Sequence, residues 1–89
     1  MNNEPLQHQH SAYTPINCSY YDQLEAWAVK RDWVNVTYLA TEGDSKTVRG
    51  IIRNLITRNH EEYMELSDGS MIRLDQLIEI NGKALPKAC

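Results

Sequence analysis

The chain has 89 residues, of which 42% are hydrophobic and 24% are charged, and its formal net charge at pH 7 is −3. This length is sufficient for one domain with a modest core. No stretch reaches the roughly 20 apolar residues of a membrane span, and the polar N-terminus does not resemble a signal peptide, so we expect a cytoplasmic protein. The acidic balance favours a basic partner and disfavours direct binding of nucleic acid.

Residues 1–14 are predicted to form a flexible N-terminal arm, because they carry too little apolar surface to offset the entropy of ordering them. His8 and His10 could chelate a metal as a pair, but no further ligand is close in the sequence. We therefore expect a solvated tail, with no metal and no cofactor. Tyr13, by its place in the arm, is expected to be exposed.

The two cysteines, Cys18 and Cys89, are too few for a disulfide framework. We expect both to be reduced thiols, although their pairing stays open at this point, and we assign chemistry to neither.

A helix is predicted from about residue 20 to residue 31, with Ser19 as its N-cap. At 100° per residue its side chains fall on two different faces. The apolar face consists of Tyr20, Tyr21, Leu24, Trp27 and Ala28. The other face is acidic and consists of Asp22, Glu25, Val29 and Asp32.

After the helix the apolar period changes to two, which predicts strands. The first covers residues 33–40 and the second residues 46–52, where Gly50 indicates a sharp bend. The boundary within residues 54–60 stays open. Residues 61–66 and 70–74 form a hairpin around Asp68-Gly69, and a last strand covers residues 77–80.

These elements predict a mainly β fold with an N-terminal helix, in which five short strands close into a small barrel. Sm-like and OB-like barrels both fit, and the helix-first order favours the Sm-like one. We expect an arm at 1–14, the helix and barrel at 15–82, and a C-terminal tail at 83–89.

No residue pattern indicates catalysis, so we expect a protein that is not an enzyme. His60, in a turn-like stretch, is interpreted as an exposed loop residue. The aromatic side chains near the helix are expected to pack in the core, because the chain has no Phe. They are Tyr20, Tyr21, Trp27 and Trp33.

Arg73 and Asp75 alternate along the fourth strand and should emerge on one face, where they can pair with each other or with Arg58 and Glu62. We interpret this group as structural.

Asp22 and Glu25 stand three residues apart and project from one surface of the helix. A solvated helix face is the plain interpretation. Val29 among the carboxylates favours a small interface instead, in which charges steer and one apolar side chain anchors. The rival is an Sm-like module that binds single-stranded RNA itself through an exposed tyrosine and the basic residues Lys46, Arg49, Arg53 and Arg58.

Two segments resemble the bacterial Rho-binding antiterminators, the Rof or YaeO family. The first is Pro-Ile-Asn-Cys at residues 15–18, followed by Tyr21-Asp22 and Leu24-Glu25. The second is Glu62-Tyr63 with Leu66 and Gly69, followed by Ile-Arg-Leu-Asp-Gln-Leu at residues 72–77. Residues 33–57 match the family in pattern more than in letters.

The resemblance implies an Sm-like barrel that binds the transcription termination factor Rho near its primary RNA site, blocks RNA loading and relieves termination. We expect a monomer, because the acidic face needs to stay free and no long apolar surface is evident, and we expect neither nucleic acid nor a membrane as a partner. Together with the helix face, the resemblance gives these candidate contact residues: Tyr13, Asn17, Tyr21, Asp22, Glu25, Val29 and Arg58.

Overall fold

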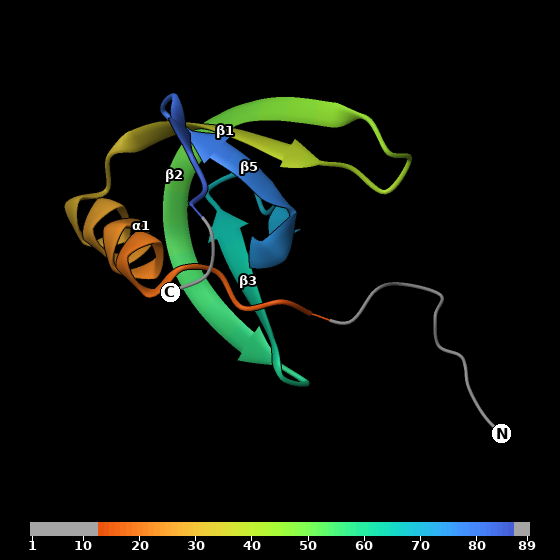
Figure 1. Ribbon diagram of the computed structural model, residues 1–89. Coiled ribbons are helices and arrows are strands. Elements are labelled where there is room, and N and C mark those ends of the chain that lie inside the picture. The colour runs from red at the N-terminus through yellow and green to blue at the C-terminus, as the bar shows by residue number, and fades with distance from the viewer. Residues whose placement is uncertain (1–12, 87–89) are drawn as a thin grey trace, which may run out of the picture.

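The computed structural model describes residues 13–86, in which one helix precedes six strands (Figure 1). The elements in order are α1 (Cys18–Lys30), β1 (Trp33–Leu39), β2 (Ser45–Arg58), β3 (Glu61–Leu66), β4 (Met71–Arg73), the short 3₁₀ helix η2 (Leu74–Gln76), β5 (Leu77–Ile80) and β6 (Lys83–Ala84). Most of the expected N-terminal arm, including His8 and His10, lies outside the described residues. So does the end of the expected C-terminal tail.

The helix begins two residues earlier than predicted, because Asn17 and not Ser19 is its N-cap. The Asn17 Oδ1 accepts hydrogen bonds from the backbone N–H groups of Ser19 (2.9 Å) and Tyr20 (3.1 Å). These bonds satisfy two N–H groups that the first helical turn leaves without partners. At the other end Arg31 adopts a left-handed conformation (φ 57°), which stops the helix.

The strands form one antiparallel sheet in the order β4-β3-β2-β1-β5-β6. The predicted closed barrel of five strands is therefore wrong in both respects. The Asn81-Gly82 turn returns the chain along β5 as a sixth strand that the sequence pattern was too short to indicate, with Ile80 opposite Lys83. At the other edge β4 has only three residues before η2 begins, and within residues 13–86 it pairs with β3 alone.

Strand β2 is long and curved, and it carries both halves of the sheet (Figure 1). Its first part pairs with β1 and its second part with β3, and the register shifts between Ile52 and Asn54. The sequence predicted the bend at Gly50, and the irregularity in β2 begins two residues later, at Ile52. The open boundary is settled, because β2 runs on to Arg58 and turns through Asn59 and His60, both at positive φ.

The buried side chains of α1 and of the sheet form one hydrophobic core. The helix contributes Tyr20, Leu24 and Trp27, as predicted, and the rings of Tyr20 and Trp27 meet edge to face at 6.4 Å. The other buried side chains are Ile16, Val34, Val36, Ile52, Met64, Leu66, Ile72, Leu74, Leu77 and Ile80. The expectation of burial is wrong for Trp33, which is 55% exposed because it lies on the face of β1 opposite to that of the buried Val34 and Val36.

Cys18 is disulfide-bonded, so the expectation of a reduced thiol is wrong at this position. The other cysteine of the chain, Cys89, lies outside the described residues. Within residues 13–86, no helix is long and apolar enough to cross a membrane.

Candidate functional site

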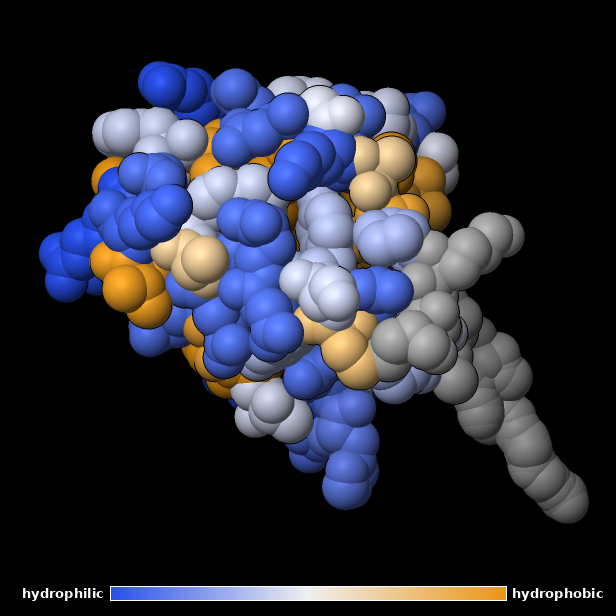
Figure 2. Space-filling view, turned by 60° about the vertical axis from the view of Figure 1, so that its left-hand side comes forward, coloured by the Kyte–Doolittle hydropathy of each residue, from blue (hydrophilic) through white to orange (hydrophobic). Residues whose placement is uncertain are grey.

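The outer side of α1, which carries Asp22, Glu25 and Val29, is exposed, as the helical periodicity predicted. Asp22 and Glu25 both point to solvent, and Val29 is 83% exposed. Figure 2 brings the side of the molecule that carries α1 forward, and its hydrophobic residues form small separate spots among hydrophilic ones. A partner of this face would meet charge with isolated apolar contacts.

Tyr13 is half-buried and not exposed, because its ring packs against the core and its hydroxyl finds a partner. The hydroxyl donates a hydrogen bond to Oε1 of Glu62 (2.8 Å) in β3. The guanidinium of Arg73 lies over the ring, 5.7 Å from its centre. Burial raises the pKa of the Tyr13 hydroxyl, and the bond to the Glu62 carboxylate raises it further.

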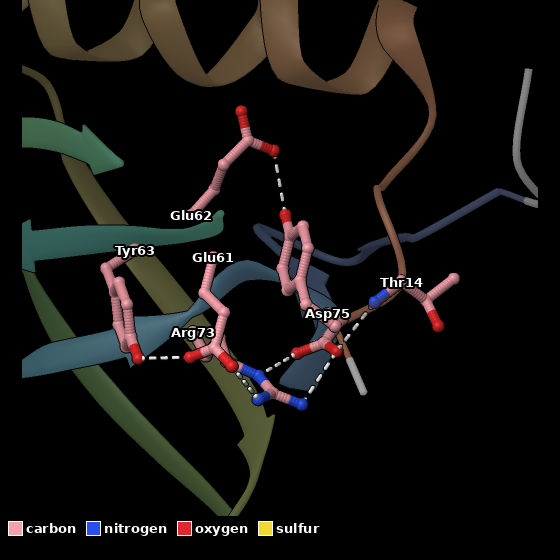
Figure 3. A network of polar contacts seen from close by, with 7 residues as sticks. Thr14, Glu61, Glu62, Tyr63, Arg73 and Asp75 are labelled. Carbon is pink, nitrogen blue, oxygen red and sulfur yellow. Dashed lines mark hydrogen bonds and ion pairs between the residues drawn. The ribbon is translucent and has the colours of Figure 1, made fainter. Parts of the chain in front are cut away.

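The segment before α1 is attached to the sheet by a network of polar contacts (Figure 3). Arg73 donates to Asp75 through Nε (2.7 Å) and Nη2 (2.9 Å), and its Nη1 lies 3.3 Å from Oε2 of Glu61. The second oxygen of Asp75 also accepts from the backbone N–H of Thr14 (3.1 Å). The predicted pair of Arg73 and Asp75 is confirmed, but their third partner is Glu61 and not Glu62.

Tyr21 connects the helix face to the network. It is half-buried, and its pKa is raised by burial and then by the negative charges of Glu62 and Glu25. The carboxylate of Glu62 also points from β3 towards α1 (Figure 3). Glu62 belongs with the helix carboxylates, and we define the acidic face as Asp22, Glu25 and Glu62. Helical periodicity could not predict this, because Glu62 stands on β3.

Two of the candidate contact residues have other surroundings. Asn17 is half-buried and its side-chain oxygen caps the helix, so its role is first structural. Arg58 is exposed at the end of β2, opposite Glu61 in the β2–β3 register. The hydrogen bond to Glu61 raises the pKa of Tyr63, and the positive charge of Arg58 lowers it by a smaller amount. Within residues 13–86, no hydrogen bond or ion pair connects Arg58 with α1.

A groove of about 700 Å³ lies between the end of α1 and the bend of β2. Val29 lines it together with basic side chains, not with carboxylates as the helix pattern suggested. The lining residues are Ala28, Val29, Arg31, Ile51, Ile52, Arg53, Asn54 and Ser67. Sequence reasoning missed this groove, because its two walls come from segments that only the fold brings together.

Within residues 13–86, no group of three or more His, Cys, Asp or Glu side chains is arranged to hold a metal ion. No family model, no curated protein and no solved structure matches this chain. The argument for function therefore rests on the chain's own residues.

Proposed function

We propose that this protein binds the transcription termination factor Rho near its primary RNA-binding site, blocks RNA loading and so inhibits termination. The observation that carries the proposal is a contact between the second segment of the resemblance and the two residues that directly precede the first. Thr14, beside the first segment, donates to Asp75 of the second, and Tyr13 donates to Glu62 of the second. Residues 49 or more positions apart thus form one side of the molecule.

The same proposal includes an Sm-like arrangement of the elements, with an open sheet in place of a closed barrel. The helix-first order and the long curved β2 that serves both halves of the sheet support it. Several residues of the resembling segments have structural roles here, since Ile16, Leu24 and Leu74 are buried and Asn17 caps α1. Among the exposed residues of these segments, Asp22 and Glu25 are the charged ones, and they are available for contact with a partner.

The mechanism is electrostatic. A protein groove that neutralises RNA phosphates is basic, and the acidic face, defined by Asp22, Glu25 and Glu62, presents carboxylates to it. The helix is held by its buried side, so these carboxylates need little reordering on binding. The interaction involves no chemical step, and we propose that the protein is not an enzyme and acts as a monomer.

The test is competition for Rho between this protein and a single-stranded RNA. The Asp22→Lys/Glu25→Lys variant should bind Rho at least about tenfold more weakly, because each change replaces attraction with repulsion. Wild-type affinity should fall as salt rises. Undiminished Rho binding by the folded double variant would discard the acidic face.

The matched control is Glu42→Lys/Asp44→Lys. It makes the same change in net charge at two exposed carboxylates in the β1–β2 turn, away from α1. Its affinity for Rho should stay within about twofold of wild type if a specific face and not the total charge is recognised.

The rival interpretation, an RNA-binding module that uses four basic residues and an exposed tyrosine, has little support. Lys46 and Arg58 stand near opposite ends of the 14-residue β2, so the four basic residues do not form one patch. None of the five tyrosines, all of which lie within residues 13–86, is fully exposed. The exposed aromatic side chain is Trp33.

A further inference from the structure

The groove between α1 and the bend of β2 has a charge opposite to that of the whole chain. Its lining includes two arginines, Arg31 and Arg53, and no carboxylate. Within the described residues neither arginine has an ion-pair partner, since the ion pairs there are those of Arg73. Two guanidinium groups on the rim of one groove form a site suited to phosphate, which their planar forks bind in two-point contacts.

An exposed aromatic side chain stands next to the groove. Trp33 is directly opposite Ile51 in the β1–β2 register, so the two side chains share one face of the sheet, and Ile51 lines the groove. The guanidinium of Arg49 lies 5.1 Å from the centre of a Trp33 ring. A 55% exposed indole beside a basic groove provides a flat surface for stacking.

We propose that this groove binds a nucleotide, either free or within a short single-stranded RNA, with the phosphate at Arg31 and Arg53 and the base at Trp33. The volume of about 700 Å³ lies in the range of small-ligand sites. Apolar side chains of Ala28, Val29 and Ile51 line the groove. The net charge of −3 repels long polyanions, so the site is suited to one or two nucleotides.

The site is separate from the acidic face and does not depend on Rho. The sequence led us to expect no direct nucleic-acid partner, because net charge averages over the whole chain. The fold brings Arg31, Arg49 and Arg53 to the groove and to Trp33 beside it. Arg31 stands at the end of α1, and the other two stand on β2.

The test is titration of the full chain, followed by tryptophan fluorescence, with uridine monophosphate, a uridine tetranucleotide and a hexaglutamate peptide. Trp33 should report binding, since Trp27 is only 9% exposed. Saturable quenching by both nucleotide probes is expected. Equal affinities would identify a free nucleotide as the ligand, and tighter binding of the tetranucleotide would identify a strand.

Arg53→Gln should weaken nucleotide binding at least about tenfold, because it removes charge-assisted hydrogen bonds. Arg31→Gln should do the same, and if it fails to fold, Arg53→Gln decides alone. Arg58→Gln is the matched control outside the groove and should change affinity less than about twofold. Because one phosphate is neutralised at Arg31 and Arg53, the slope of log affinity against log salt for the tetranucleotide should be about −0.7.

Three results would each overturn the proposal. They are the absence of saturable quenching, an equal loss of affinity in Arg58→Gln and Arg53→Gln, and binding of hexaglutamate as tight as that of the tetranucleotide. The last result would mean that the groove is a site for an acidic peptide.

Discussion

Replacing Arg73 by methionine should destabilise the fold strongly. Methionine keeps much of the apolar stem, but the variant loses two charge-assisted hydrogen bonds to Asp75 and the ion pair to Glu61. The side chains of Arg73 and Asp75 are only 12% exposed, and that of Glu61 is 22% exposed, so water replaces these bonds incompletely. The cation–π contact with Tyr13 is lost as well.

The magnitude follows from the number and burial of these contacts. Hydrogen bonds to charged groups contribute about 1.5–3 kcal/mol each, and breaking a buried pair costs about 3–5 kcal/mol. Because the network is partly solvated, the lower end applies, and we expect a loss of about 3 kcal/mol in the free energy of unfolding. For a domain of this size that is a fall of about 12–24 °C in the melting temperature.

The assay is urea unfolding followed by tryptophan fluorescence without reductant, so that the disulfide at Cys18 is kept in every sample. Arg58→Met is the matched control, since Arg58 is exposed, and it should shift stability by less than about 0.5 kcal/mol. A double-mutant cycle with Asp75→Asn should give a coupling of at least about 1 kcal/mol. A loss below about 1 kcal/mol for Arg73→Met, with an unchanged m-value, would refute the role given to this network.

Three further predictions concern stability. Folding raises the pKa of the Tyr13 hydroxyl, so the stability contributed by its protonated form is complete below the ordinary tyrosine pKa of about 10. The free energy of unfolding should therefore fall as the pH rises above that value. In melting curves recorded at several pH values, Tyr13→Phe should make this fall smaller. Asn17→Ala should cost about 1 kcal/mol in urea unfolding, and Asn17→Asp should restore most of it. Leu24→Ala should cost about 2–5 kcal/mol, whereas Val29→Ala, at an 83% exposed position, should cost less than about 0.5 kcal/mol in the same assay.

The fold could be predicted where local pattern and tertiary packing agree. The helix face of Tyr20, Leu24 and Trp27, the hairpin at Asp68-Gly69 and the strand Leu77–Ile80 all follow from residue spacing and turn chemistry. The closed barrel did not follow, because closure depends on edge strands that local pattern does not fix. Two neighbouring cap residues explain the helix start, since Asn17 and Ser19 are both good N-caps and only the structure chooses between them.

The candidate site could be predicted in part, and its errors share one physical reason. Exposure of Asp22, Glu25 and Val29 follows from helical periodicity alone. Tyr13 was misjudged because its partner Glu62 lies 49 positions away, and contacts at such separation leave no local sign in a single sequence. The same reason hid the groove, whose arginines come from the end of α1 and from β2.

The core contacts of α1 and its proposed contacts with Rho lie on opposite sides of the helix, so the proposed function can be tested without confusion from unfolding. The inner side of α1 holds the helix in the core, and the network around Arg73 fixes the segment that leads into it. Asp22 and Glu25 take part in none of the described hydrogen bonds or ion pairs, so reversing their charges removes no native contact. A variant that loses Rho while its unfolding curve stays unchanged would therefore have lost a binding surface and not a fold.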